Sequence, residues 1–233
     1  MVRMTDADGL AALAAIFADP TRAAFCLALM DGRAWTAGEL ARHAGVAGPT
    51  ATGHLHRMVD AGVLVEHRQG RHRYVRLAGP QVAQLVETLH AHRPAGPPAR
   101  TLRAVTARAA LEAARTCYDH LAGRLGVAVT DALTTTGLLD QDNGFAVTPA
   151  GLRWFDREMG VELVGRRPVA RSCIDWTERR VHLGGAAGAA LCATFLERRW
   201  VTRVGTGRAL RVTDDGKTAL RNLLGVEGLT NAA

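Results

Sequence analysis

The second half of the chain contains two copies of one sequence pattern. The segment 114–119, which reads Ala-Arg-Thr-Cys-Tyr-Asp, recurs at 170–175 as Ala-Arg-Ser-Cys-Ile-Asp. A His-Leu pair followed by glycines comes next in both copies, at 120–126 and at 182–188. Each copy continues into an apolar helical stretch, a glycine-containing turn with strand-like flanks, and a helix that opens with threonine. The repeat predicts that residues 101–233 form a mainly helical domain in which one small structure occurs twice.

The first half begins with a series of short helices. Apolar residues at helical spacing predict a helix over 10–17, and Asp19 followed by Pro20 predicts the start of a second helix. Thr36 with Glu39 three residues later is a capping-box pattern, which opens a third, short helix. The segment therefore supplies three helices in close succession.

A fourth helix and a hairpin follow. Gly45 ends the third helix, and Pro49 opens a helix over 49–61 after a tight connection, which is the pattern of a helix-turn-helix. From Val63 apolar and polar residues alternate, and this predicts two strands joined by a polar turn at 69–71. The arms and tip of the hairpin carry Arg68, Arg71, Arg73 and Arg76. Helices, helix-turn-helix and basic hairpin in this order predict a winged helix.

A Pro/Gly-rich stretch at 93–98 separates the two halves. The expected organisation is a winged helix-turn-helix domain over 1–92, a linker over 93–100, and a duplicated sensor or structural domain over 101–233. The expected fold class is mainly α with small β-hairpins, and the second domain is expected to consist of two winged-helix-like repeats.

The charge of the chain favours nucleic acid as a partner. Lys and Arg number 29 against 22 Asp and Glu, a formal net charge of +7, and the only lysine is Lys217. The rigid guanidinium fork of arginine suits phosphates and base edges. A GC-rich genome would also enrich a chain in Ala, Gly and Arg, so the positions of the arginines have to decide between the two explanations.

The sequence contains no apolar run of the roughly 18–20 residues that a membrane span needs, and its beginning does not follow the pattern of a secretory signal. We expect a cytoplasmic protein with no membrane partner. Its four cysteines are too few for a disulfide scaffold and are expected to be thiols.

Residues 8–92 resemble the ArsR/SmtB family of bacterial transcriptional repressors. The resemblance is carried by Phe17-Ala18-Asp19-Pro20-Thr21-Arg22, Glu39-Leu40-Ala41, His54-Leu55, Ala61-Gly62-Val63-Leu64 and the wing at 71–77. It implies a homodimer formed through the first and last helices of the domain. It also implies that the second helix of the helix-turn-helix enters the major groove of double-stranded DNA while the wing follows the DNA backbone.

The DNA-contacting residues are expected on the 49–61 helix and on the wing. They are Thr50, Thr52, His54, Arg57, Arg68, Arg71 and Arg73. Leu55, Met58 and Val59 are expected to face the domain core. The chain departs from the family pattern at Gly53, where an arginine is common.

The inducer sites that many family members carry are absent from the sequence. Trp35-Thr36-Ala37-Gly38 stands where relatives have Cys-x-Cys, and Glu87, His90 and His92 do not complete the ligand set of the last helix. Cys26 lies in an apolar run and is expected to be an ordinary buried residue.

Residues 101–225 resemble a C-terminal extension found in a subgroup of these regulators. They contain no phosphate-cradling glycine loop, GxSxG elbow or HExxH pair. We therefore expect no enzymatic activity. An enzyme with an accessory winged helix, handling a metal or a small molecule, is the alternative from another class, and a winged-helix protein-interaction module is a second one.

The repeat brings cysteine and histidine in each copy, namely Cys117 with His120 and Cys173 with His182. Cys117 and His120, three residues apart, are expected on one face of a helix. Together the four residues are a ligand set suited to Zn²⁺ or another thiophilic metal. Packing in a core of small residues and sensing by a thiol or an organic-ligand site are the alternatives.

Three tryptophans in an aromatic-poor chain, Trp154, Trp176 and Trp200, are candidates to line a ligand pocket, with core packing as the alternative. The sequence as a whole predicts a DNA-binding transcriptional regulator. The expected mode of action is a repressor that an unidentified effector, bound in the C-terminal domain, releases from its operator.

Overall fold

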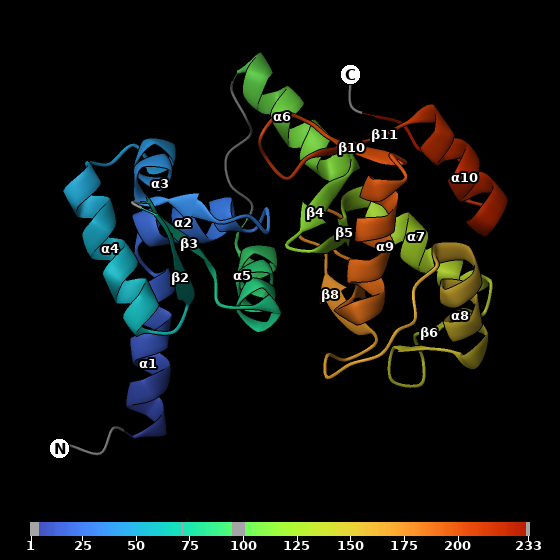
Figure 1. Ribbon diagram of the computed structural model, residues 1–233, viewed down its shortest axis with the longest axis horizontal. Coiled ribbons are helices and arrows are strands. Elements are labelled where there is room, and N and C mark those ends of the chain that lie inside the picture. The colour runs from blue at the N-terminus through green and yellow to red at the C-terminus, as the bar shows by residue number, and fades with distance from the viewer. Residues whose placement is uncertain (1–4, 71, 95–100, 232–233) are drawn as a thin grey trace. The chain divides into compact units, whose positions relative to one another are not determined.

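The structure, a computed structural model, describes residues 5–70, 72–94 and 101–231 (Figure 1). It divides into two units, Met1–Val86 and Glu87–Ala233, and the division falls within helix α5 (Pro80–His92). Most of the predicted linker, residues 95–100, lies outside the described residues. Each unit is described by itself below.

The N-terminal unit has the predicted helix-turn-helix and hairpin. Its elements are α1 (Asp6–Phe17), α2 (Pro20–Leu29), β1 (Trp35–Thr36), α3 (Ala37–Ala44), α4 (Gly48–Asp60), β2 (Leu64–Gln69), β3 (His72–Leu77) and the first part of α5. The caps are those that the sequence predicts. Asp19 accepts a hydrogen bond from the backbone N–H of Arg22 at 2.9 Å, Thr36 and Glu39 form a capping box, and Gly45 ends α3 with φ of 67°.

The hairpin gains a third strand that the sequence did not indicate. β1 pairs antiparallel with β3, with Trp35 opposite Val75, so the strand order is β1-β3-β2. For this segment the sequence predicted only the cap of the following helix, at Thr36. The core beneath this sheet consists of fully buried side chains from the helices and both wing strands, namely Phe25, Leu29, Met30, Leu40, Leu55, Met58, Leu64 and Leu77.

The C-terminal unit starts with the rest of α5 and with α6 (Leu102–Ala113). The first repeat is β4 (Arg115–Cys117), β5 (His120–Ala122), α7 (Gly123–Thr135), β6 (Leu139–Asp140), β7 (Ala146–Val147) and α8 (Pro149–Trp154), extended by a π-helical turn at Phe155–Met159. The second repeat is β8 (Arg171–Ile174), β9 (Val181–Gly184), α9 (Gly185–Glu197), β10 (Val201–Arg203), β11 (Leu210–Val212) and α10 (Asp214–Leu224). Both repeats have the order strand, strand, helix, strand, strand, helix, which confirms the predicted duplication and the mainly α fold class.

The two repeats exchange contacts at their first hairpins. Helix α7 packs against β9, helix α9 packs against β5, and β5 lies beside β9. Each helix carries a glycine at this contact. A Cβ added to Gly126 would lie 2.5 Å from the carbonyl oxygen of Leu121 and 3.6 Å from Cβ of His182, and one added to Gly188 would lie 2.2 Å from the Leu183 oxygen and 3.1 Å from Cβ of His120. The repeated glycines therefore allow each helix to pack closely on the leucine carbonyl of its own hairpin, and Gly188 also allows α9 to approach His120 of the other repeat.

The hydrophobic core of the C-terminal unit is built from both repeats, with Leu125, Val129 and Leu133 of α7 packed in one cluster with Leu191 and Phe195 of α9. Within the described residues no single helix has the length and apolarity to cross a membrane; α1 and α2 reach that length and apolarity only when taken as a pair, which is bent by 78°.

Candidate functional sites

The candidate DNA-binding face lies on α4, opposite its buried side. Ala51, Leu55 and Met58, spaced by four and three residues, form the buried face of the helix. Thr50, Gly53 and Arg57, spaced by three and four residues, form another face, which is exposed. Thr50 and Arg57 are exposed on that outward face, and Gly53 lies between them with no atom within 4 Å of an added Cβ. The expected contacts Thr50 and Arg57 thus share one surface of the helix.

Two other expected contacts on α4 have partners within the unit. The Thr52 hydroxyl donates to the carbonyl of Gly48 at 3.0 Å. The Nδ1 atom of His54 lies 3.3 Å from Nη1 of Arg22 and 3.7 Å from Oδ1 of Asp19, and its ring packs edge-on against Phe25. His54 is therefore half-buried and holds α4 against α2.

The wing arginines differ in how they are held. Arg73 lies 2.6 Å from Glu66 across the hairpin and 2.7 Å from Nε2 of His56 on α4, so it ties the wing to that helix. The side chain of Arg68 is 80% exposed and contacts Glu66 through Nε at 3.3 Å. Arg71 lies outside the described residues. Sequence reasoning missed His56, which the helical spacing from the buried Leu55 and Met58 could have placed on the exposed side.

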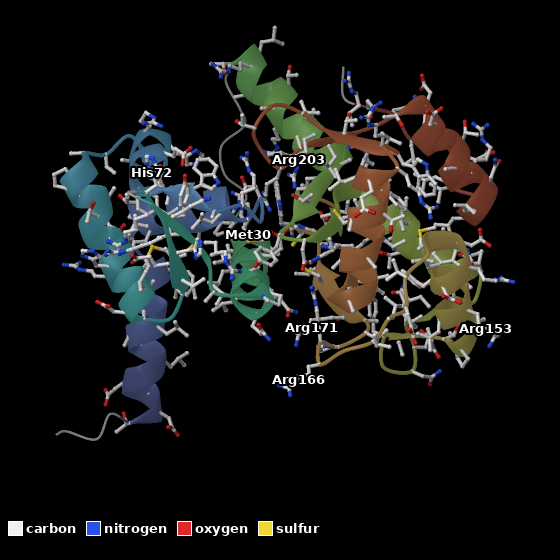
Figure 2. The ribbon with its side chains drawn as sticks, viewed as in Figure 1. Met30, His72, Arg153, Arg166, Arg171 and Arg203 are labelled. Carbon is white, nitrogen blue, oxygen red and sulfur yellow. The ribbon has the colours of Figure 1, made fainter. Side chains whose placement is uncertain are left out.

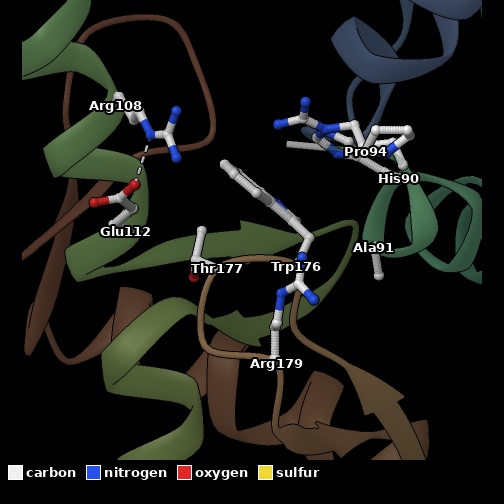
Figure 3. Close-up of a pocket in the computed structure, with 9 residues that line it drawn as sticks. His90, Ala91, Pro94, Arg108, Glu112, Trp176, Thr177 and Arg179 are labelled. Atoms are coloured by element: carbon white, nitrogen blue, oxygen red, sulfur yellow. Dashed lines mark hydrogen bonds and ion pairs between the residues drawn. The ribbon is translucent and has the colours of Figure 1, made fainter. Parts of the chain in front are cut away.

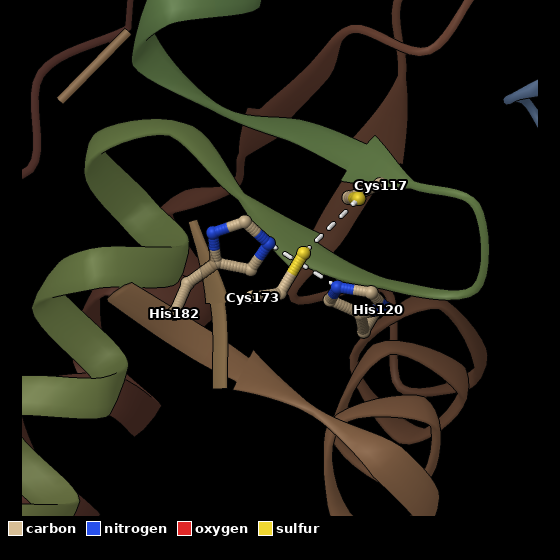
Figure 4. Close-up of side chains that lie close together, drawn as sticks. All are labelled: Cys117, His120, Cys173 and His182. Carbon is tan, nitrogen blue, oxygen red and sulfur yellow. Dashed lines mark hydrogen bonds between the residues drawn. The ribbon is translucent and has the colours of Figure 1, made fainter. Parts of the chain in front are cut away.

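The second candidate site is formed by Cys117, His120, Cys173 and His182 in the C-terminal unit (Figure 4). Cys117 and His120 do not lie on a helix as expected. They face each other across the β4–β5 hairpin, as Cys173 and His182 do across β8–β9. The helical interpretation was wrong because a spacing of three residues also fits a tight hairpin, in which Tyr118 takes a positive φ of 59°.

The side chains of the two hairpins converge on one point. The Sγ atoms of Cys117 and Cys173 lie 3.9 Å apart, and the Nε2 atoms of His120 and His182 lie 3.2 Å apart. All four ligand atoms lie within 4.8 Å of one another, and all four residues are buried. We call these four residues the Cys/His cluster.

Each histidine of the Cys/His cluster has an aspartate at its other ring nitrogen. Nδ1 of His120 lies 3.1 Å from Oδ1 of Asp119, and Asp119 is held in turn by Arg167. Nδ1 of His182 lies 3.3 Å from Oδ2 of Asp175, within ion-pair distance but without an aligned hydrogen bond. Both aspartates stand two residues after the cysteine of their repeat, so the duplication also repeats this pairing.

The surroundings of Cys117 favour the protonated form of its thiol. The contact with Cys173 and burial raise the pKa of the Cys117 thiol. Burial opposes charging of His120, but Cys117 and Asp119 outweigh it and raise the pKa of the imidazole.

A buried ion network adjoins the Cys/His cluster. Arg115, fully buried, lies 3.0 Å from Oδ2 of Asp175 and 3.3 Å from Oε1 of Glu87 on α5. Arg208 lies 3.5 Å from the other oxygen of Glu87. Burial alone would raise the pKa of Glu87, but Arg208 and Arg115 lower it. Two guanidinium groups thus balance two carboxylates away from water.

A small pocket lies beside this network (Figure 3). Trp176 stacks on His90 of α5 with ring centroids 4.7 Å apart, and the guanidinium groups of Arg93 and Arg115 lie 5.8 and 4.8 Å from the centroid of the indole. The volume is about 160 Å³, below the roughly 300–1,000 Å³ of pockets that hold drug-sized ligands.

The structure does not bring the three tryptophans together. Trp154 belongs to the hydrophobic core and packs edge-on against Phe155, Trp200 packs against that core beside Phe195, and Trp176 lines the small pocket. Cys26 is buried, and burial raises the pKa of its thiol to about 12. In the last helix of the family module, Glu87 is held by arginines and His92 contacts the carbonyl of Thr88.

Comparisons with known proteins agree with the N-terminal architecture. A family described as a helix-turn-helix domain matches residues 17–68. A curated relative, the uncharacterized HTH-type transcriptional regulator YdfF of Bacillus subtilis (strain 168), is 38% identical over 223 residues, which are 94% of this chain and 98% of the relative.

Solved structures similar to the chain cover a smaller part of it. The transcriptional repressor BigR from Xylella fastidiosa is 27% identical, with 39% of this chain and 91% of that chain covered and a TM-score of 0.35. The cadmium metal-sensor CMTR from Mycobacterium tuberculosis is 28% identical, with 40% and 99% covered and a TM-score of 0.30.

The relationship to YdfF extends over nearly the whole of both chains, so it includes the duplicated C-terminal unit as well as the winged helix. The helix-turn-helix of α3 and α4, the wing of β2 and β3, and this full-length relationship agree with the resemblance seen in the sequence. The chain belongs to the HTH-type transcriptional regulators, and its N-terminal unit is a winged helix-turn-helix.

Proposed function

We propose that this DNA-binding regulator is a repressor that acts as a homodimer in the cytoplasm and is released from its operator by an effector bound in the C-terminal unit. The observation that carries the proposal is the outward face of α4, where Thr50, Gly53 and Arg57 are exposed away from the buried side of the helix. No catalytic reaction is assigned to the chain.

The role proposed for each side chain, either direct contact with DNA or positioning of α4 and the wing, follows from its contacts in the structure. Arg57 and Thr50 are free to meet base edges or phosphates, and Arg68 is positioned for phosphate contact at the wing. His54 and Arg73 act indirectly, because their contacts with Arg22, Glu66 and His56 fix α4 and the wing in place. Arg71, at the tip of the hairpin in the sequence, completes the proposed set.

The homodimer is supported by the apolar surface of α1. This helix has no buried residue, and Leu10 is 70% and Leu13 37% exposed. Exposed leucines close together on one short helix favour burial of that surface against a partner. The family resemblance assigns dimerisation to this first helix and to the last helix of the domain, and α5 exposes Leu85 and Leu89.

The proposal is tested by titrating the full chain with duplex DNA from the region upstream of its own gene and with a scrambled duplex of equal length. We expect a preference of roughly 10³-fold or more for the upstream duplex and an affinity that falls steeply with salt. Sedimentation is expected to give a dimer. Equal affinity for both duplexes, or a monomer at the concentrations that bind DNA, would contradict the proposal.

A reporter gene placed behind the upstream region tests the direction of regulation. Repression predicts higher expression when the gene for this chain is deleted and lower expression when it is restored. The opposite response would identify an activator, and no response would remove that region as the operator.

A further inference from the structure

We propose that Cys117, His120, Cys173 and His182 bind one Zn²⁺ ion as a closed tetrahedral site that joins the two repeats of the C-terminal unit. The inference does not depend on the DNA-binding proposal, because it rests on the geometry of the Cys/His cluster alone.

The distances within the cluster match those of a tetrahedral zinc site. Zinc bonds of about 2.3 Å to sulfur and about 2.0–2.1 Å to nitrogen, at tetrahedral angles, place two sulfurs roughly 3.8 Å apart and two nitrogens roughly 3.3 Å apart. The corresponding separations are 3.9 Å between the Sγ atoms and 3.2 Å between the Nε2 atoms. The side chains therefore already have the spacing that the ion requires.

The orientation of the histidines fits the same role. Both Nε2 atoms point into the cluster, while Asp119 and Asp175 face the two Nδ1 atoms. A zinc-bound histidine commonly donates its second N–H to a carboxylate, which fixes the tautomer and increases the basicity of the ligand. With Zn²⁺ bound, the carboxylates would accept from Nδ1 and both Nε2 lone pairs would be available for the metal.

Packing alone does not explain why both repeats have the same polar residues at the Cys/His cluster. A core of small apolar residues needs neither a buried imidazole pair nor an aspartate behind each ring, since buried polar groups are costly without partners. Both repeats nevertheless carry cysteine, aspartate and histidine here. Gly188 of the second repeat lets α9 come close to His120 of the first, since an added Cβ would lie 3.1 Å from Cβ of His120. The shared residues are thus concentrated around the proposed ion.

The burial of the site indicates a structural ion. Four protein ligands fill a tetrahedral shell, and none of the four residues is more than 8% exposed, so no position is left for water or substrate. Each repeat supplies one sulfur and one nitrogen, so the ion can bind fully only when the repeats are docked. Its binding free energy therefore adds to the folding free energy of the unit.

The first test measures metal in the full chain purified under reducing conditions, and cobalt binding after the metal has been removed. We expect about one equivalent of zinc per chain. With Co²⁺ we expect the sulfur-to-cobalt charge-transfer bands and the intense visible bands of a tetrahedral site. Less than about a tenth of an equivalent after incubation with Zn²⁺, or a cobalt spectrum without sulfur ligation, would overturn the proposal.

Cysteine-to-serine substitutions test which residues bind the ion. Cys117→Ser and Cys173→Ser should each lose stoichiometric zinc and the charge-transfer bands. Cys192→Ser is the matched control, because Cys192 is equally buried in α9 but lies outside the cluster, and it should keep both. Zinc retained in both ligand variants, or lost in the control alone, would contradict the assignment.

A measurement on the wild-type chain covers the case in which the ligand variants fail to fold. Removing the ion with a chelator should lower the melting temperature of the chain, and adding back Zn²⁺ should restore it, whereas Mg²⁺ should not. An unchanged melting temperature, or a Cys117–Cys173 disulfide found by thiol titration in the reduced preparation, would reject the site. Operator binding measured on the same samples reports separately on the proposed function.

Discussion

Asp175 accepts a hydrogen bond from the backbone N–H of Gly123 at 2.7 Å, so a carboxylate of the second repeat caps helix α7 of the first. Helix α7 has no side-chain cap of its own. The same carboxylate meets Arg115 and His182, and its Oδ1 accepts from the backbone and hydroxyl of Thr177. One side chain thus links a helix end, the buried ion network and the Cys/His cluster.

Replacing Asp175 should destabilise the C-terminal unit strongly. Asp175→Ala leaves the buried guanidinium of Arg115 short of one partner and the Gly123 N–H without an acceptor, so we expect a loss of about 3–5 kcal/mol in the free energy of unfolding. Chemical denaturation measures it. Asp131→Asn is the control, because Asp131 pairs only with the exposed Arg180 among the contacts described, and it should cost less than about 1 kcal/mol. Equal losses in both variants would contradict this account.

The glycines at the repeat contact should not tolerate a methyl group. In Gly188→Ala the new Cβ would lie 2.2 Å from the carbonyl oxygen of Leu183, a backbone atom that cannot move away alone. We expect a loss of about 1–3 kcal/mol or more. Gly53→Ala on α4 is the contrasting variant, since its Cβ meets nothing within 4 Å, and it should gain about 0.5–1 kcal/mol from helix propensity. Thermal unfolding measures whether each variant is less or more stable than the wild type.

A single arginine on α4 should account for part of the salt dependence of DNA binding. If Arg57 meets a phosphate, Arg57→Ala weakens binding to all duplexes and makes the log–log salt slope shallower by about one unit. If it meets a base edge, the loss falls mainly on the operator. Arg153 projects from α8 of the other unit (Figure 2) and provides the control, Arg153→Ala, which should leave affinity and slope unchanged. An Arg57 variant that binds like wild type would remove α4 from the interface.

The pH dependence of stability should reflect His90. Burial lowers the pKa of His90 to about 4, helped by Arg93, Arg208 and Arg115 and opposed by Glu87, whereas in the unfolded chain it is about 6.5. As pH falls from about 6.5 to 4, the unfolded chain binds a proton that the folded chain does not, so stability decreases across this window. The decrease in the free energy of unfolding from pH 7 to pH 5 should be smaller in His90→Gln than in wild type. An equal decrease would show that His90 does not titrate in this way.

Local chemistry made much of the N-terminal fold predictable from the sequence. The caps at Asp19 and Thr36 and the left-handed Gly45 depend on residues within one turn of each other, so the sequence contains the whole interaction. The pairing of β1 with β3 was missed because Trp35 and Val75 are 40 positions apart and two residues carry no periodicity.

The residues of the Cys/His cluster could be predicted from the sequence, but the local structure that holds them could not. The recurrence of cysteine and histidine in both repeats identified all four residues as candidates. The three-residue spacing of Cys117 and His120, however, was interpreted as one face of a helix. The spacing alone does not distinguish one helical turn from a tight hairpin. Which of the two forms depends on the partner strand and on the turn at Tyr118.

The sequence by itself determined the order of the elements, the duplication and the residue types available in each repeat, since these follow from periodicity, capping and repetition along the chain. Only the tertiary structure decided that α7 packs on β9 and α9 on β5, that four side chains from two hairpins meet within 4.8 Å, and that Trp154 and Trp200 belong to the core. The meeting of the two repeats depends on contacts between residues far apart in the sequence, such as Cys117 with Cys173, which are 56 positions apart. Which of the many possible long-range contacts form is set by the packing of the whole unit.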